Sequence, residues 1–116
     1  MIKKADEMVT ELKNQMRGGN GTVEINHIFK QDELNGKARL FARISLNPGC
    51  SIGLHEHNAE EEIYYIIKGK AVVNDNGNTK EVIAGDAVLT GNGASHSIEN
   101  RCEEPVDMIA VILLYT

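Results

Sequence analysis

The sequence has few features of an exported or membrane-spanning protein. It contains two cysteines, Cys50 and Cys102, and neither lies in a C-x-x-C pair. The longest apolar run, Met108 to Tyr115, is far too short to cross a bilayer, and its length suits a strand buried on both faces. The first sixteen residues carry acidic side chains throughout and lack the apolar segment of a signal peptide. We therefore expect a cytoplasmic protein with two free thiols.

Basic charge is scarce as well. The chain has 12 lysines and arginines against 17 acidic residues, which gives a net charge of -5. Nucleic acids and anionic membranes bind basic faces, so we expect neither as a partner. The sequence also lacks a phosphate-binding glycine loop and a Ser-His-Asp set.

Short β-forming runs and turn signals dominate most of the chain. About eight such runs follow one another at the spacing of an all-β sandwich or barrel. Four Asn-Gly pairs, starting at residues 20, 35, 76 and 92, suit tight turns between the runs. A chain of 116 residues has room for one core. The sequence therefore predicts one small antiparallel barrel domain over residues 21–116.

The N-terminal segment has a different pattern. Apolar residues recur there at helical spacing, namely Ile2, Ala5, Val9, Leu12 and Met16. A glycine-rich stretch from Arg17 to Gly21 ends this pattern. We predict a short N-terminal α-helix and a connector, which together cover residues 1–20. The apolar stripe of this helix would pack on the barrel or on another subunit.

Two of the four histidines lie one residue apart. On a strand, residues i and i+2 point to the same face, so His55 and His57 would project together. Glu62 follows at the start of the next β-forming run, and His96 begins a separate run further along. Taken alone, the histidine pair or the three glutamates that start at Glu60 are more often a charged segment than a metal site. Their joint spacing with several glycines gives the pattern more weight.

This joint spacing resembles the two sequence motifs of the cupin family. The first motif is matched by Gly49, His55, His57, Glu62 and Gly69, and the second by Gly85, Gly91, Gly93, His96 and Asn100. One position departs from the family pattern, because Gly91 stands where cupins usually have proline. Asn100 is expected to fix a strand end through side-chain bonds to the backbone. The two motifs span residues 49–100, nearly half of the chain.

The resemblance implies a cupin jelly-roll barrel, or double-stranded β-helix, with a metal ion inside. Carried over by position, the metal ligands are His55, His57, Glu62 and His96. Glu61 fits a looser form of the first motif, but only Glu62 has the required six residues between it and Gly69. Imidazole and carboxylate ligands suit one divalent transition metal, Fe, Mn, Ni, Zn or Cu, better than Ca or Mg.

Residues next to these ligands have less certain roles. If Glu62 points into the barrel, strand alternation also turns Tyr64 inward. Tyr64 would then either donate a hydrogen bond or proton to a metal-bound ligand, as a catalytic residue, or simply fill the barrel. Glu60 and Glu61 are expected in a loop, from which either could bond to a metal ligand. His27 is expected to be an ordinary strand histidine.

The resemblance is compatible with more than one function. The protein would be a small mononuclear metalloenzyme acting on a chelating small molecule, as a dioxygenase, an isomerase or epimerase, or a decarboxylase. The alternative is a non-catalytic binding or sensing domain in which the metal anchors a small-molecule ligand. A third interpretation makes the metal purely structural. Because single-domain cupins are commonly dimers, the resemblance also implies a homodimer.

Overall fold

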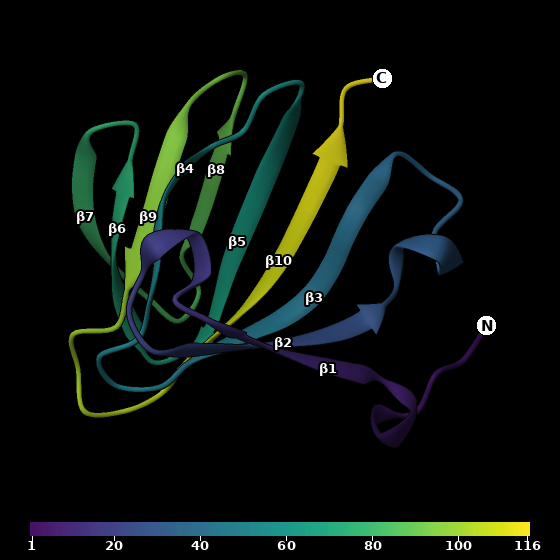
Figure 1. The fold of residues 1–116 in the computed structure, drawn as a ribbon, viewed down its shortest axis with the longest axis horizontal. Helices are drawn as coiled ribbons and strands as arrows, with labels where there is room; N and C mark the ends of the chain where they lie inside the picture. Colours follow the sequence, from purple (N-terminus) through teal and green to yellow (C-terminus); the bar gives the residue numbers. More distant parts are fainter.

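The computed structural model describes residues 1–116 as ten β-strands and three short 3-10 turns, arranged in two antiparallel sheets (Figure 1). The larger sheet has the order β1-β2-β3-β10-β5-β8 and the smaller one the order β4-β9-β6-β7. The strands are β1 (Val9–Asn14), β2 (Thr22–Phe29), β3 (Ala38–Leu46), β4 (Ser51–Glu56), β5 (Glu60–Lys68), β6 (Lys70–Asp75), β7 (Asn78–Ile83), β8 (Ala87–Gly91), β9 (Ser95–Glu99) and β10 (Val106–Leu114). This is the all-β jelly roll that the sequence predicts. No helix is long and apolar enough to cross a membrane.

One apolar core lies between the two sheets, and strand alternation decides which side chains enter it. In β5, Tyr64 is 1% exposed whereas its neighbour Tyr65 is 47% exposed. Ile66, two residues beyond Tyr64, is buried as well, and in β9 both His96 and Ile98 are buried. The prediction that Tyr64 points into the barrel from β5 is therefore confirmed.

The apolar run near the C-terminus forms β10, which lies between β3 and β5 in the larger sheet. Its inward residues are buried, namely Met108, Ala110 and Ile112. Its outward residues Ile109 and Val111 are only half-buried. The expectation of burial on both faces is wrong within this chain, because the smaller sheet covers only the inner side of β10.

The predicted N-terminal α-helix is wrong. The segment contains a 3-10 turn, η1 (Ala5–Glu7), followed by the strand β1. All of β1 pairs antiparallel with β2, from Val9 opposite His27 to Asn14 opposite Thr22. A short isolated helix is marginal in water, whereas the edge of an existing sheet offers β1 a row of backbone partners. The division of the chain at residues 20 and 21 stays a prediction.

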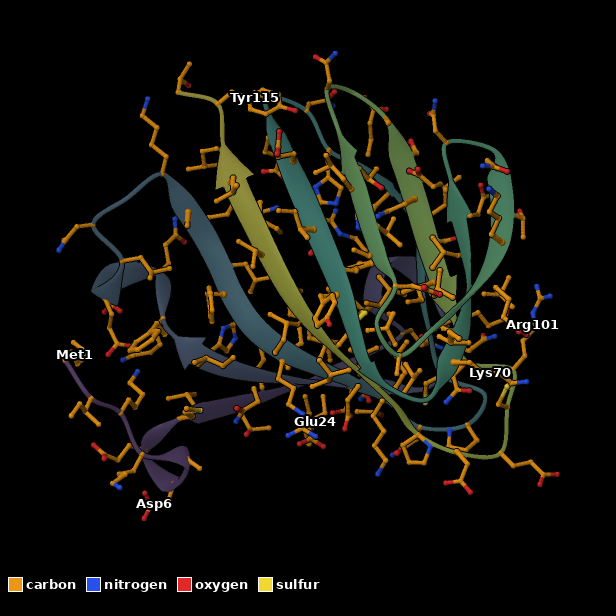
Figure 2. The ribbon with its side chains drawn as sticks, turned by 180° about the vertical axis from the view of Figure 1, so that it is seen from behind. Met1, Asp6, Glu24, Lys70, Arg101 and Tyr115 are labelled. Carbon is orange, nitrogen blue, oxygen red and sulfur yellow. The ribbon has the colours of Figure 1, made fainter.

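The apolar stripe of the supposed helix is correspondingly not buried as a unit. Leu12, on the outer side of β1, is 67% exposed. The hairpin of β1 and β2 extends away from β6 and β7 (Figure 1), and Met1 and Asp6 lie at its far end (Figure 2). The spacing of the apolar residues was thus a coincidence of an exposed strand and not a packing surface.

Two residues of the second motif have clear structural roles. Asn100 is buried and its amide donates to the backbone oxygens of Leu46 and Glu104, at 2.9 and 2.8 Å, as the sequence predicts. At Gly91, an added Cβ would lie 2.5 Å from the Cβ of Glu61. Because side-chain atoms cannot approach so closely, glycine at this position lets β8 lie close against β5.

Candidate metal centre

The structure brings His55, His57, Glu62 and His96 together between the two sheets. His55 lies in β4 directly opposite His96 in β9, and His57 follows one residue after the end of β4. Glu62 reaches them from β5 in the larger sheet. One ligand atom from each residue lies within 4.8 Å of all the others. The cluster therefore depends on both sheets and on residues up to 41 positions apart.

The separations within the cluster are short and similar. Nε2 of His96 lies 3.0 Å from Nε2 of His55, from Nε2 of His57 and from Oε1 of Glu62. Oε1 of Glu62 is also 3.0 Å from Nε2 of His57. His57, Glu62 and His96 are buried, so water has little access to compensate these polar atoms. A positive group shared by the four donor atoms would compensate their lone pairs at these distances.

The outer nitrogens of two imidazoles have their own partners. Nδ1 of His55 lies 2.7 Å from the backbone oxygen of Gly53, and Nδ1 of His57 lies 2.5 Å from Oε2 of Glu60. Since these oxygens only accept, both Nδ1 atoms donate, and both Nε2 atoms are left as electron-pair donors that point into the cluster. Nδ1 of His96 has no such partner. The imidazole ring of His96 is instead stacked on the Tyr64 ring, with 4.8 Å between the two ring centroids.

Glu60 is not the loop residue that the sequence predicts. It is the first residue of β5, and Glu61 follows it within the strand. Beyond its bond to His57, the Glu60 carboxylate accepts hydrogen bonds from Nε and Nη2 of Arg39 at 2.8 and 2.9 Å. The Arg39 guanidinium accordingly holds the pKa of Glu60 below its usual range. The expected bond from this acidic segment to a ligand is therefore present, and Glu60 is the residue that makes it.

The electrostatics of the cluster keep a negative charge at its centre. Burial disfavours the ionised form of Glu62, but the three neighbouring imidazoles outweigh it and hold the pKa of Glu62 below its usual range. Burial lowers the pKa of His96, whereas the hydrogen bond with Glu62 raises that of His57. Glu62 is therefore ionised at neutral pH, in a position to neutralise part of a cation's charge.

Tyr64 extends from β5 next to Glu62 and is buried. Its hydroxyl oxygen lies 3.4 Å from Nε2 of His96. Burial raises the pKa of Tyr64 well above its ordinary value, so the phenol keeps its proton at neutral pH. Tyr64 can consequently donate a hydrogen bond at the edge of the cluster, but it does not act as a base there.

A cavity of about 550 Å³ opens beside the cluster, and His55, His57, Glu62 and Tyr64 form part of its wall. The opposite wall comes from the N-terminal hairpin, including Arg17 in the turn between β1 and β2. His27 also lines the cavity, and its Nε2 lies 3.0 Å from Oε1 of Glu11. The cavity is large enough for a small molecule next to the four donor atoms.

Sequence reasoning missed Arg17, which the structure places at this cavity. Arg17 has a positive φ of 55° and Gln15 one of 49°, an unusual backbone for residues with side chains. Close packing on β4 holds the turn there, since a Cβ at Gly53 would lie 2.1 Å from the backbone oxygen of Arg17. The glycines at 18, 19 and 21 were the only available signal of a tight turn, and no motif marks the arginine.

The cluster fits a divalent metal ion. Two atoms bound to one ion at about 2.1 Å lie about 3.0 Å apart when their bonds meet near a right angle. Four separations within the cluster have this value. A single proton on Nε2 of His96 would satisfy at most two of its neighbours, whereas a cation would satisfy all four donors. His55, His57, Glu62 and His96 could thus hold a metal ion.

Comparison with known proteins agrees with this arrangement. Residues 42–112 match the Cupin domain family, which is more than half of the chain. This chain is a cupin. It is 46% identical over 114 residues to the oxalate-binding protein of Thermotoga maritima, covering 98% of this cupin and 94% of that protein.

Solved structures show the same fold. This cupin superposes with a TM-score of 0.92 on a crystal structure from Thermotoga maritima described as a predicted oxalate decarboxylase, with 46% identity and coverage of 98% and 99% of the two chains. A sugar phosphate isomerase of the cupin superfamily from Silicibacter pomeroyi gives a TM-score of 0.76 at 16% identity, covering 97% of this cupin and 75% of that chain. The second likeness concerns the fold alone.

Proposed function

We propose that this cupin binds one divalent transition-metal ion through His55, His57, Glu62 and His96, and through it a small dicarboxylate of the oxalate type. The observation that carries the proposal is the opening of a buried three-imidazole, one-carboxylate cluster into a cavity with a free arginine. Imidazole with carboxylate suits Fe, Mn, Ni, Cu or Zn. When bound, the ion would supply a Lewis acid for the oxygen atoms of a chelating ligand.

Arg17 provides the second half of the proposed recognition. It lines the cavity, and no carboxylate in the chain lies within ion-pair distance of its guanidinium. The other cavity-lining arginine, Arg39, is already bonded to Glu60. A guanidinium can bind a carboxylate through two parallel hydrogen bonds. Arg17 would therefore select anionic ligands, in agreement with the name of the 46% identical oxalate-binding protein.

The side chains in the cavity favour binding over turnover. Glu60 is bonded to Arg39 and His57, and Glu11 is paired with His27, so neither carboxylate is free to accept a proton. Outside the proposed ligands, no unpaired base lines the cavity wall. Proton transfer to or from a ligand would thus lack an acceptor on the protein.

A second candidate function is a metalloenzyme, and Tyr64 is the observation in its favour. Its protonated hydroxyl, 3.4 Å from His96 Nε2, is suitably placed to donate a hydrogen bond or proton to a molecule held at the cluster. Decarboxylation of the bound dicarboxylate, isomerisation and oxygenation of a chelating substrate are the reactions that this arrangement would serve. In that case Tyr64 would be the catalytic residue.

Calorimetric titration with oxalate tests the proposal on protein loaded with Mn²⁺ or Co²⁺. We expect the wild type to bind oxalate, His96→Ala to lose the metal, and Arg17→Gln to keep the metal but bind oxalate about tenfold or more weakly. Arg101→Gln is the control, since Arg101 is an exposed arginine on the side of the molecule away from Met1 (Figure 2). Absence of oxalate binding by the metal-loaded wild type would refute the proposal.

The same sample separates binding from catalysis. Carbon dioxide released from oxalate by the wild type, and lost in Tyr64→Phe, would favour the enzyme. Stable binding without release of product would favour the binding protein.

We also propose that the protein is a cytoplasmic homodimer, as its sequence predicts.

A further inference from the structure

The cavity beside the four proposed ligands is larger than an oxalate ion needs. Its volume is about 550 Å³. Even if each non-hydrogen atom of oxalate took the room of a water molecule, about 30 Å³, the anion would fill only about 180 Å³. Cavities of several hundred Å³ usually hold larger molecules. With oxalate at the cluster, more than half of this cavity would therefore stay free.

The free part of the cavity extends across the larger sheet, away from the cluster. Tyr64 and His27 both line the cavity. They belong to one row of directly opposed residues, namely Tyr64 on β5, Ala110 on β10, Ala42 on β3 and His27 on β2. Because neighbouring strands are about 4.8 Å apart, Tyr64 and His27 are separated by about 14 Å along the sheet. His27 therefore lies at the end of the cavity that is remote from the cluster.

The wall between the two ends is apolar. Four aliphatic side chains from the intervening strands line it, namely Ile112 on β10, Leu40 and Ile44 on β3, and Ile25 on β2. Ile112 lies opposite Glu62 on one side and opposite Leu40 on the other, so the apolar wall begins directly beside a proposed ligand. Such a wall favours a hydrocarbon chain or ring, because contact with it removes apolar surface from water.

The remote end carries a carboxylate that can accept further hydrogen bonds. Oε1 of Glu11 accepts a hydrogen bond from Nε2 of His27 at 3.0 Å, and Oε2 lies 3.9 Å from Nζ of Lys13. All three residues line the cavity, and the Glu11 side chain is 44% exposed. The hydrogen bond from His27 lowers the pKa of Glu11, so this carboxylate is ionised at neutral pH. Since a carboxylate has about four acceptor positions, Glu11 can also accept a hydrogen bond from a ligand without taking its proton.

We infer that this cupin binds a chelating acid longer than oxalate, with an apolar body and a hydroxyl or amino group at its far end. The acid end lies at the metal position and Arg17, the body covers the aliphatic wall, and the far end donates to Glu11. About 14 Å along the sheet, less about 3 Å for that hydrogen bond, is enough for an acid with a six-membered ring between its two ends. The inference rests on the proposed function, because the acid end is anchored as oxalate would be.

Three 2-oxo acids with a common chelating end test the inference by calorimetric titration of Mn²⁺-loaded protein. Pyruvate offers the chelating end alone, phenylpyruvate adds the ring, and 4-hydroxyphenylpyruvate adds a hydroxyl at the far end. We expect phenylpyruvate to bind about tenfold or more tightly than pyruvate, because its ring is removed from water. We expect the hydroxyl to raise the affinity about tenfold again, since it donates to an ionised carboxylate.

Two variants assign these effects to parts of the cavity. Glu11→Ala should remove the tenfold effect of the hydroxyl and leave oxalate binding unchanged. Glu24→Ala is the matched control, since Glu24 is exposed on β2 of the same hairpin, does not line the cavity and lies at the edge of the molecule (Figure 2). Leu40→Trp should fill the middle of the cavity and weaken phenylpyruvate about tenfold or more. Its unchanged binding of oxalate would show that the variant is folded.

The outcomes separate this inference from the proposed function. A metal-loaded wild type that binds neither oxalate nor any of the three acids would overturn both. Binding of oxalate, with phenylpyruvate bound no more tightly than pyruvate, would overturn only the longer ligand. An effect of the hydroxyl that is equal in Glu11→Ala and Glu24→Ala would overturn the role of Glu11 at the remote end.

Discussion

Glu60 should control the metal affinity of the centre without touching the metal. Its carboxylate accepts the Nδ1 proton of His57 at 2.5 Å, and this bond fixes Nε2 of His57 as the free electron pair that faces the cluster. In Glu60→Gln, one of the two carboxylate oxygens becomes an amide group that only donates. If the amide faces His57, the imidazole must take the other tautomer, and its Nε2 proton then points at the metal position.

If the amide instead faces Arg39, two donors oppose each other and the guanidinium loses its counter-ion. The first arrangement breaks the bond from His57, whereas the second keeps an acceptor for His57 but removes the ion pair that holds Glu60 in place. Removal of such an outer partner usually costs about 10- to 100-fold in metal affinity. This corresponds to about 1.4 to 2.7 kcal/mol. We expect a loss of this size for Glu60→Gln, measured by competition with a chelator of known affinity.

Two variants separate this effect from a general loss of stability. Glu61→Gln is the matched control, because Glu61 is the next residue of β5 but points away from the cluster. Arg39→Met removes the ion pair but keeps the bond from His57 to Glu60, so its metal affinity should change less than that of Glu60→Gln. The reasoning is refuted if Glu60→Gln binds metal as tightly as Glu61→Gln does.

Two further predictions concern stability. Hydrogen bonds from the Ser45 hydroxyl and from Arg43 outweigh burial and hold the pKa of Asp107 below its usual range. The ionised Asp107 carboxylate therefore stabilises the fold above about pH 4, and this stabilisation is lost as the pH falls through the lowered pKa. Asp107→Asn should therefore lower the free energy of unfolding at pH 7 by only about 1 kcal/mol, because the Arg43 side chain is 50% exposed. In urea titrations, the difference in this free energy between the variant and the wild type should shrink towards pH 3. A difference that does not change with pH would contradict this prediction. Gly53→Ala should destabilise the fold by about 1–3 kcal/mol in thermal unfolding, because its Cβ would meet the backbone of Arg17 at 2.1 Å. Gly36→Ala, where an added Cβ meets nothing within 4 Å, should be close to neutral, and equal effects of the two changes would refute the packing argument.

Much of this protein follows from local sequence patterns. Strand alternation correctly places Tyr64 inside and Tyr65 outside, because side chains on a strand point to opposite faces whatever lies beyond them. The fixed spacing of histidines, glutamate and glycines resembles the cupin motifs, and it selects Glu62 among three consecutive glutamates. The structure brings that glutamate, and not Glu61, to within 3.0 Å of His96.

The features that the sequence does not determine depend on partners far away in the chain. The spacing of Val9 and Leu12 favours a helix, and only the available edge of β2 decides for the strand β1. Arg17 reaches the cavity because its turn packs on β4, more than thirty residues later in the chain. Glu60 bonds to His57 and Arg39 because β5 begins earlier than its composition indicates. The sequence alone therefore determines most of the strands and, through the resemblance to cupins, the four candidate ligands. The cavity, its free arginine and the strand β1 exist only once distant segments have paired.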